Sequence, residues 1–467
     1  MRTKIVATLG PASQKIDVLK QLLQLGVRIF RLNFSHGSAK DFAPLVQKVR
    51  TLEEELGEPI TLLQDLCGPK IRIGQLKKSP LTIHKGHLYF LGKGDEGAKN
   101  FIPFKELSLL EHLRPKDIVK ISDGGLSFEV QKNTATELVL KAKDSGIISS
   151  GKGITFPGKK LNVPSITSKD KKDLIEGLEL GLDAVALSFV QGPEDIAQAK
   201  AICEKHIGRS LPIIAKLERQ AALDRLEDIL AIADGIMVAR GDLGLECPLP
   251  KLPFIQKHII KSCRKFGKPV IVATQMLLSM VNNPMPTRAE TTDVANAILD
   301  STDCVMLSEE TAIGKYPAEC VEYLKQIAEE AEKNIFRTRK SLPEPGLDHP
   351  ETFIAHAACV LASELKAKAL LAHTNSGTTA RLLSSFRPEQ PIYGLSPDKH
   401  ISKYMNFFWG VIPTFIQDTL EDHLRRVEFY IENSSLFQKQ DILVVTAGHP
   451  KNKEQQAPTN LIKVYIK

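Results

Sequence analysis

Residues 3–33 read TKIVATLGPASQKIDVLKQLLQLGVRIFRLN. The β-branched start stops at Gly-Pro and predicts a strand, the leucines at 16–25 fall on one side of a helix, and the run at 27–33 predicts a second strand. A helical pattern at 42–56 and a strand-like run at 61–66 repeat the unit. Strands that alternate with helices indicate a parallel sheet.

Residues 70–165 interrupt this alternation. They hold short alternating runs between Gly, Asp and Asn turns, which predict a small all-β domain. The runs are 81–83, 88–91, 118–121, 126–130 and 137–142. The segment carries 17 basic and 9 acidic side chains, a net charge of +8, whereas the whole chain is +7. The positive charge therefore belongs to this insert, where it suits an anionic substrate, a nucleic acid or a membrane surface.

The alternation resumes after residue 168. Five further strand-like runs follow with helical patterns between them: 184–189, 212–217, 235–239, 269–273 and 304–307. Three strands before the insert and five after it make eight βα units, which predicts a TIM barrel with its chemistry at the C-terminal ends of the strands. An open doubly wound sheet is the alternative, and the count favours the barrel.

A Pro-rich join at 342–346 predicts a boundary before a third domain. Beyond it we expect a helix at 353–367 and strands at 369–373, 391–395, 410–415, 441–446 and 461–465. The predicted fold class is α/β. It combines a (β/α)8 TIM barrel at 1–69 and 166–340, an inserted small β-barrel lid domain at 70–165, and a C-terminal doubly wound α/β domain at 341–467.

The composition narrows the class of protein. Hydrophobic residues make up 42% and charged residues 25%, as in ordinary globular chains. Because no apolar run approaches about 18 residues, we expect neither a signal peptide nor a membrane span. Seven scattered cysteines with no C-x-x-C spacing predict a reduced, cytoplasmic protein without a disulfide framework or zinc site. One Trp, seven Tyr and no basic helix argue against nucleic-acid binding.

Polar residues end six of the eight predicted barrel strands. These ends are Arg31-Leu32-Asn33-Phe34-Ser35-His36-Gly37, Gln64-Asp65, Lys216-Leu217-Glu218, Arg240-Gly241-Asp242, Thr274-Gln275 and Ser308-Glu309-Glu310. Any one of them could be a loop charge or a helix cap, as Ser308 could be. Their joint occurrence predicts that they converge on one cavity.

The residue types at these ends suit phosphoryl transfer. Glu218 and Asp242 are oxygen ligands that could hold Mg²⁺, and Lys216, two residues before Glu218, faces the same side of its strand. Arg31 and Arg72 supply guanidinium groups suited to phosphate. Metal, ammonium and guanidinium together favour phosphoryl transfer, although neither a Walker A sequence nor a G-x-G-x-x-G after a strand is present.

Seven ordered stretches resemble the pyruvate kinase family. They are residues 3–13, 31–37, 214–218, 237–244, 273–276, 286–297 and 306–312. The resemblance implies Mg²⁺-dependent (or Mn²⁺-dependent) transfer of the phosphoryl group of phosphoenolpyruvate to ADP, giving pyruvate and ATP, which is the last step of glycolysis. It also implies an allosteric enzyme that forms a homotetramer.

The resemblance implies a role for each site residue. Glu218 and Asp242 would bind the metal, and Lys216 would neutralise the transferring group and the enolate. Thr274 and Ser308 would serve protonation of the enolate carbon. The backbone from Ala239 through Arg240 and Gly241 to Asp242 would hold the substrate carboxylate. The phosphates of ADP would meet Arg31, which is also expected to be catalytic, and Asn33, His36, Arg72 and Lys152.

The chain departs from the family next to strand three. Many members read D-T-K-G-P-E-I-R where this chain has Asp65-Leu66-Cys67-Gly68-Pro69-Lys70-Ile71-Arg72. In the Glu-containing members the resemblance implies a potassium ion held at positions matching Asn33, Ser35, Asp65 and the Leu66 carbonyl. We predict that the Lys70 ammonium replaces it, so that K⁺ is not required. The alternative is that Lys70 is a solvated charge at the hinge of the lid.

The third domain carries a candidate effector site. Thr374, Asn375, Ser376, Gly377, Thr378 and Thr379 link a strand to a helix and could cradle a phosphate, although they would equally form an ordinary cap. The resemblance favours an allosteric phosphate site, with residues 448–458 as its partner loop and fructose bisphosphate, a sugar monophosphate or AMP as effector.

Two rival functions remain open at the level of sequence. One is a metal-dependent aldolase on a similar barrel, which would need neither the basic lid nor Lys216. The other is a catalytically silent sensor of sugar phosphates, which would be expected to have lost the residues at the strand ends.

Overall fold

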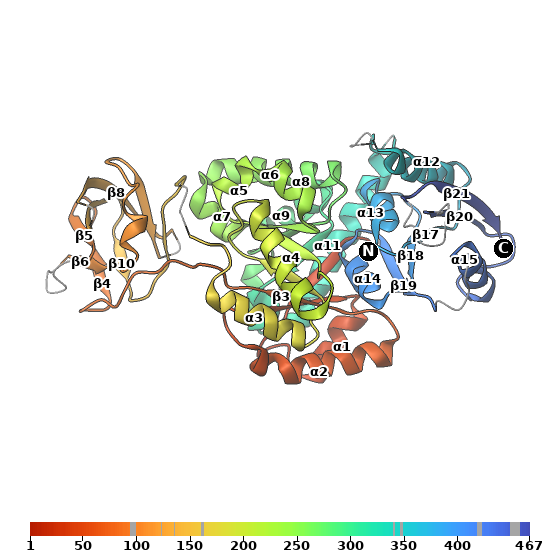
Figure 1. Cartoon of the computed structure of the whole chain (residues 1–467), viewed down its shortest axis with the longest axis horizontal. Coiled ribbons are helices and arrows are strands. Elements are labelled where there is room, and N and C mark those ends of the chain that lie inside the picture. The colour runs from red at the N-terminus through yellow and green to blue at the C-terminus, as the bar shows by residue number, and fades with distance from the viewer. Residues whose placement is uncertain are drawn as a thin grey trace.

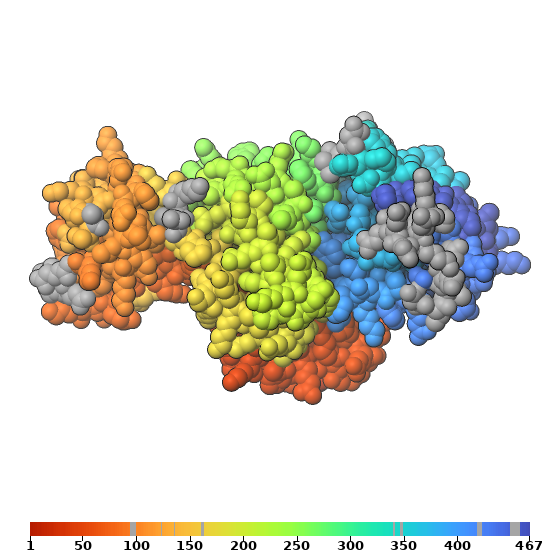
Figure 2. Space-filling view, viewed as in Figure 1, coloured from red at the N-terminus to blue at the C-terminus, as the bar shows by residue number. Residues whose placement is uncertain are grey.

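The chain folds into three lobes arranged in a row (Figure 1). The computed structural model describes residues 1–93, 100–122, 124–134, 136–159, 163–339, 341–345, 349–417, 423–448 and 458–467. The inserted all-β lobe lies at one end, the barrel in the middle and the C-terminal α/β lobe at the other end, and Figure 2 shows the same order on the surface. Within the described residues, every helix is too short or too polar to span a bilayer.

The central lobe is a closed parallel barrel. Its strands are β1 (Lys4–Thr8), β2 (Ile29–Asn33), β3 (Thr61–Asp65), β12 (Ala184–Leu187), β13 (Ile213–Leu217), β14 (Gly235–Ala239), β15 (Val270–Ala273) and β16 (Cys304–Leu307). Each pairs with the next in chain order, and β16 closes on β1 with Lys4 opposite Cys304. The predicted (β/α)8 barrel is confirmed, and the open sheet is wrong. Because all strands are parallel, their C-terminal ends share one mouth.

Helices surround the barrel between successive strands. They are α1 (Ile16–Gln24), α2 (Ala39–Leu56), α3 (Ser168–Glu179), α4 (Pro193–Ile207), α5 (Gln220–Asp224), α6 (Leu226–Ile232), α7 (Arg240–Glu246), α8 (Leu252–Lys265), α9 (Arg288–Leu299), α10 (Glu309–Ala312) and α11 (Pro317–Thr338), with 3₁₀ turns at Leu249–Lys251 and Leu278–Val281. Their local sequences fit these roles. The predicted apolar side of α1 buries Leu19, Leu22 and Leu23, and the Thr167 hydroxyl caps α3 by accepting from the Asp170 amide.

The insert is a curled all-β unit with its own apolar core. Its elements are β4 (Leu81–Ile83), β5 (Leu88–Gly92), β6 (Phe101–Pro103), a 3₁₀ turn (Leu107–Leu109), β7 (Ile118–Ile121), β8 (Leu126–Asn133), β9 (Glu137–Ala142), β10 (Gly146–Ile148) and β11 (Ile154–Thr155). The larger sheet has the order β11-β7-β8-β9-β5-β6, and β10 pairs with β4. The sequence prediction missed β6, β10 and β11. The equally short β4 was found because its residues Leu-Thr-Ile alternate apolar and polar, whereas Phe-Ile-Pro in β6 and Gly-Ile-Ile in β10 show no such alternation.

The C-terminal lobe is the predicted doubly wound α/β domain. Its elements are α12 (Pro350–Glu364), β17 (Ala369–His373), α13 (Thr378–Ser385), β18 (Ile392–Ser396), α14 (Lys399–Tyr404), a 3₁₀ turn (Met405–Phe407), β19 (Val411–Phe415), α15 (His423–Asn433), β20 (Ile442–Ala447) and β21 (Leu461–Ile466). In β17, Leu370 packs in the cluster that holds α12 and α13, whereas Leu371 packs with α15. Successive residues of a strand face opposite sides, so helices cover both faces of this sheet.

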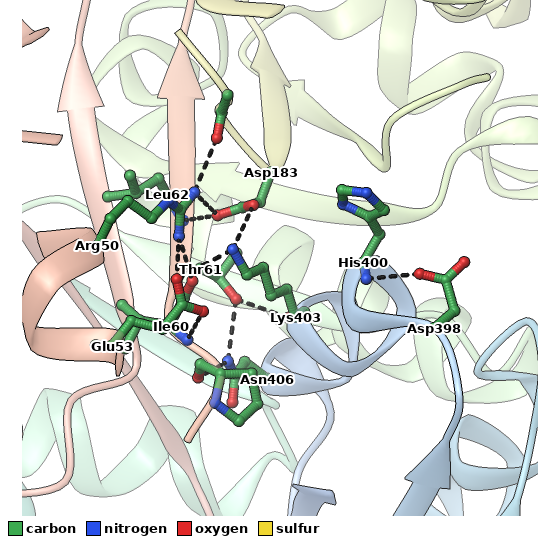
Figure 3. Close-up of polar contacts among 12 residues, drawn as sticks. Arg50, Glu53, Ile60, Thr61, Leu62, Asp183, Asp398, His400, Lys403 and Asn406 are labelled. Carbon is green, nitrogen blue, oxygen red and sulfur yellow. Dashed lines mark hydrogen bonds and ion pairs between the residues drawn. The ribbon is translucent and has the colours of Figure 1, made fainter. Parts of the chain in front are cut away.

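The C-terminal lobe docks on the barrel at the end opposite the mouth (Figure 3). Lys403 Nζ lies 3.1 Å from Glu53 Oε2 and 3.2 Å from Asp183 Oδ1, and Arg50 Nη2 lies 2.6 Å from Asp183 Oδ2. Thr61, the first residue of β3, donates its hydroxyl to the Lys403 carbonyl at 2.6 Å. Asp183 and Thr61 stand at the N-terminal ends of their strands. The mouth of the barrel is therefore left to the lid.

Candidate active site

A buried lysine stands at the centre of the barrel mouth. Lys216, near the end of β13, places its Nζ 3.1 Å from Asp65 Oδ1, 3.0 Å from Glu218 Oε1 and 2.6 Å from the Ser188 hydroxyl. Burial by itself would lower the pKa of Lys216, but Asp65 and Glu218 outweigh it and raise that pKa. The ammonium is thus kept charged among fixed oxygen atoms.

A second cation shares the Asp65 carboxylate. Arg31, in β2, donates from Nε to Asp65 Oδ2 at 2.6 Å and from Nη1 to the Thr8 hydroxyl at 3.0 Å. Asp65 is 1% exposed, and burial would raise its pKa, but Lys216 and Arg31 together hold that pKa below its ordinary value. Both oxygens of Asp65 are therefore committed to orienting the two cations, which stabilises the ionised carboxylate.

Two carboxylates, those of Glu218 and Asp242, line the pocket beside this cluster. Glu218 is 1% exposed; burial and the neighbouring charge of Asp242 raise its pKa, while Lys216 opposes the rise. Glu218 Oε2 accepts the Phe189 amide at 2.7 Å. Among the described residues no group of three or more His, Cys, Asp and Glu side chains could hold a metal. A pair of repelling carboxylates fits Mg²⁺, which commonly takes one or two protein carboxylates and fills its shell with other oxygens.

Two strand ends beside these carboxylates turn through left-handed backbone. Phe189 and Thr274 have φ values of 54° and 69°. Such values cost free energy in residues other than glycine and persist where surrounding contacts impose them. The turn at Thr274 directs its hydroxyl to accept the Gly241 amide at 3.0 Å, and Arg240 donates to the Thr274 carbonyl at 2.6 Å. These two hydrogen bonds join Thr274 to residues 239–242, the segment predicted to hold the substrate carboxylate.

Ser308 stands at the end of β16, half-buried, with its amide donating to Glu310 Oε2 at 2.7 Å. Its side chain makes no capping hydrogen bond to α10. Glu310 is fully buried and also accepts the Leu277 amide, so it braces two loops of the mouth. The reading of Ser308 as a helix cap is wrong for its side chain.

Apart from Arg31, the residues predicted to meet the nucleotide lie farther out. Asn33, the last residue of β2, is half-buried, while Ser35 and His36 in the following loop are exposed. Arg72 bridges to Gly153 in the backbone and donates from Nη1 to the Gly151 carbonyl at 3.0 Å, which places it beside the exposed Lys152. Both stand where the lid leaves the barrel.

A narrow cleft lies between the lid and the barrel mouth. Lys70 and Lys120 line it from the insert, and Glu218, Asp242 and Glu246 line it from the barrel. Burial raises the pKa of Glu246 to about 7, against the opposing effects of the Arg219 charge and the Gly158 backbone. The cleft brings the two candidate metal ligands under the basic insert.

Comparisons with known proteins decide the family. The chain matches the models of the pyruvate kinase barrel domain over residues 1–321 and of the pyruvate kinase alpha/beta domain over residues 352–465. The chain belongs to the pyruvate kinase family. A pyruvate kinase of Agrobacterium vitis is 42% identical over 99% of this chain and 96% of its own length. One of Thermotoga maritima is 38% identical over 99% and 98%, and pyruvate kinase 2 of a Synechocystis strain is 40% identical over 100% and 79%.

Membership in the pyruvate kinase family makes the chain an enzyme, a phosphotransferase. It sets aside the aldolase and the silent sensor. The structure also adds a residue that the strand-end survey missed. Ser188 follows β12, is 1% exposed, accepts from Lys216, and donates to the Leu66 carbonyl at 2.7 Å. A polar residue directly after the apolar run AVAL was the available signal.

The loop at 374–379 presents only part of its polar groups to solvent. Thr374 is buried and accepts the Gly377 amide at 2.9 Å, and the buried Thr379 shares a hydrogen bond of 2.8 Å with Thr459. Asn375 and Ser376 are exposed and Thr378 is half-buried. Of the expected partner loop at 448–458, residues 449–457 lie outside the described part of the chain.

Proposed function

We propose that this chain transfers the phosphoryl group of phosphoenolpyruvate to ADP, with Mg²⁺ (or Mn²⁺) as cofactor, giving pyruvate and ATP at the last step of glycolysis. The observation that carries this proposal is the buried Lys216 ammonium, held 3.0 Å from Glu218 and 3.1 Å from Asp65 at the barrel mouth. A fixed cation in a water-poor site stabilises charge that develops on a transferring phosphoryl group and on the enolate it leaves.

Glu218 and Asp242 would hold the divalent metal, because their carboxylates repel each other without one. The bound metal would neutralise phosphoryl oxygens and position them. Lys216 would neutralise the phosphoryl group and then the enolate oxygen. Asp65 would keep both Lys216 and Arg31 oriented, and Arg31 would add its own charge to the phosphoryl group.

The other groups of the mouth would bind and protonate the substrate. The backbone of Ala239, Arg240, Gly241 and Asp242 would hold the carboxylate of phosphoenolpyruvate, and the hydrogen bond from the Gly241 amide keeps the Thr274 hydroxyl beside this segment. Thr274 and Ser308 would direct a proton to the enolate carbon.

The phosphates of ADP would lie between barrel and lid. The proposed contacts are Arg31, Asn33, His36, Arg72 and Lys152. The hydrogen bond from Arg72 to Gly151 supports this arrangement, because it keeps two basic side chains together at the hinge. Neutralising Arg72 or Lys152 should raise the KM for ADP more than neutralising Lys77 or Lys78; Lys99, a further control, lies outside the described residues.

The test is ADP-dependent formation of pyruvate from phosphoenolpyruvate, followed through a coupled lactate dehydrogenase assay. We expect turnover in the wild type and a loss of at least about a thousandfold in Lys216→Met, since a buried charge at the reacting atoms is removed. Lys172→Met, which removes an exposed charge on α3, is the matched control. Wild-type protein that forms pyruvate without ADP, or not at all, contradicts the proposal.

We further propose that turnover needs no K⁺, because the Lys70 ammonium takes the place of that ion. Lys70 is exposed and lines the cleft with Glu218 and Asp242. Four groups are expected around a potassium ion: Asn33, Ser35, Asp65 and the Leu66 carbonyl. Two of them are already engaged, because Asp65 binds two cations and the Leu66 carbonyl accepts a hydrogen bond from Ser188.

Assays in buffers free of Na⁺ and K⁺ test this part. We expect full activity in the wild type and a K⁺ requirement in Lys70→Glu. A manyfold rise of wild-type activity on adding KCl contradicts it and supports the reading of Lys70 as a solvated hinge charge.

Regulation by a phosphorylated metabolite, a sugar phosphate or AMP, is proposed at residues 374–379. The exposed Asn375 and Ser376 support it. Activation at subsaturating phosphoenolpyruvate by each candidate, abolished in Ser376→Asp, tests it.

We also propose three domains: the catalytic barrel at 1–69 and 166–340, the inserted lid at 70–165 and the regulatory domain at 341–467. We propose further that the enzyme is cytoplasmic, which its seven unpaired cysteines support, and that it forms a homotetramer. Light scattering coupled to size exclusion tests the tetramer.

A further inference from the structure

The insert touches the barrel at the last two residues of α7. Lys120, on β7 of the insert, donates from Nζ to the Leu245 carbonyl at 2.7 Å. Gly124, in the following turn with φ +83°, lies so close that an added Cβ would stand 2.5 Å from Leu245 Cδ2. The backbone of Gly158 also lies near the Glu246 carboxylate, whose pKa it lowers. Three separate points of the lid thus converge on one end of a two-turn helix.

The other end of α7 is fixed to the barrel. Arg240, its first residue, lies 2.6 Å from Asp293 Oδ2 through Nη1 and donates to the Thr274 carbonyl through Nη2. The Gly241 amide donates to the Thr274 hydroxyl. Asp242 lies between the two anchored ends and lines the cleft. The helix is held by a barrel arginine at its start and by a lid lysine at its end.

We propose that Lys120 is a positioning residue for phosphoryl transfer: by binding the Leu245 carbonyl it holds the lid on α7 and holds Asp242 in place. This inference rests on the proposed function. An ammonium at the C-terminal carbonyls of a helix is favourable, because those carbonyls lack partners within the helix and carry the negative end of its dipole. The contact can form only when the lid sits against the mouth, so it couples closure to the arrangement of the site.

The shape of the contact supports this coupling. Lys120 and Leu245 are both half-buried, so their hydrogen bond is partly shielded from water. Gly124 leaves no room for a side chain between the lid and Leu245, so the approach of the lid sets the position of that residue directly. Asp242 and Glu246 are one helical turn apart, with three residues between them, so a displacement of the end of this short helix moves Asp242 as well.

The test compares Lys120→Met with Lys132→Met. Lys132 is an exposed lysine on β8 of the same insert, and its side chain makes no hydrogen bond or ion pair with another described residue. Lys120→Met should lower kcat/KM for phosphoenolpyruvate about tenfold or more, the size expected for a hydrogen bond with a charged donor. Lys120→Arg, whose guanidinium can donate to the same carbonyl, should recover part of the loss.

Hydrogen–deuterium exchange supplies a readout that needs neither metal nor substrate. Amides of residues 240–247 should exchange faster in Lys120→Met than in Lys132→Met, because the end of α7 loses its anchor. The proposal is overturned if either this exchange rate or kcat/KM stays within twofold of the wild type.

A second variant guards against a folding defect in the first. Gly124→Ala inserts a methyl group against Leu245 and should produce the same two changes without altering any charge, whereas wild-type behaviour in both readouts overturns the proposal. If the wild type itself forms no pyruvate from phosphoenolpyruvate and ADP, the proposed function fails instead, and the exchange arm still tests the contact of the lid.

Discussion

Ser188→Ala removes one hydroxyl from beneath the central lysine. That hydroxyl accepts from Lys216 Nζ at 2.6 Å and donates to the Leu66 carbonyl at 2.7 Å. A hydrogen bond to a charged group contributes about 1.5–3 kcal/mol. If this loss falls wholly on the transition state, kcat/KM for phosphoenolpyruvate decreases about 10- to 150-fold. The substitution also leaves the buried Leu66 carbonyl without its donor, which should lower the free energy of unfolding by about 1–3 kcal/mol.

Ser384→Ala is the matched control for this substitution. Ser384 is 2% exposed, donates to the Trp409 carbonyl at 2.7 Å and accepts from Arg387 Nη1 at 3.4 Å, so it makes the same kinds of contact away from the mouth. Steady-state kinetics and urea denaturation of both variants separate the two effects. The reasoning is refuted if both variants lose similar stability while Ser188→Ala keeps kcat/KM within threefold of the wild type.

Three further substitutions, one of them with a matched control, probe other contacts. Lys403→Met removes one of the two cations that pair with Glu53 and Asp183 and leaves Arg50 as the other, so it should lower the free energy of unfolding by about 1.5–3 kcal/mol. Arg225→Met breaks exposed pairs and should cost much less, so equal losses in urea titrations would count against this. Burial lowers the pKa of Lys4 from 10.5 to about 8. Between pH 8 and pH 10.5 the unfolded chain therefore binds more protons than the folded protein, so the free energy of unfolding rises with pH. Lys4→Met should flatten this rise, which urea denaturation at the two ends of that pH interval measures. Glu218→Gln should raise the half-saturating Mg²⁺ concentration at least about tenfold, and an unchanged Mg²⁺ titration would remove Glu218 from the metal site.

Local patterns were sufficient for much of this protein. Alternating apolar runs and helical patterns predicted the eight barrel strands, because each pattern is complete within a window of ten to twenty residues. In a parallel barrel, every strand ends at the same mouth, so polar residues at strand ends could be assembled into one site before any contact was seen. This is why Lys216, Glu218, Asp65 and Arg31 were found, and the structure brings these four together.

Other features depend on closure of the chain over long separations. Ser188 was missed because one serine after a strand is unremarkable until Lys216 and the Leu66 carbonyl are seen on either side of it. Thr374 and Thr379 look like available hydroxyls in sequence, but packing turns both inward.

The sequence by itself determined the barrel, the insert, the C-terminal α/β domain and the chemical character of the mouth, since these follow from periodicity and from residue types at predictable places. Only the tertiary structure decided which oxygens hold the Lys216 ammonium, that Asp65 divides itself between two cations, and that Lys120 reaches the end of α7 across 125 positions of sequence. The physical reason is that hydrogen bonds and ion pairs act over about 3 Å, and the proximity of residues so far apart in the chain is set by how whole strands and lobes pack.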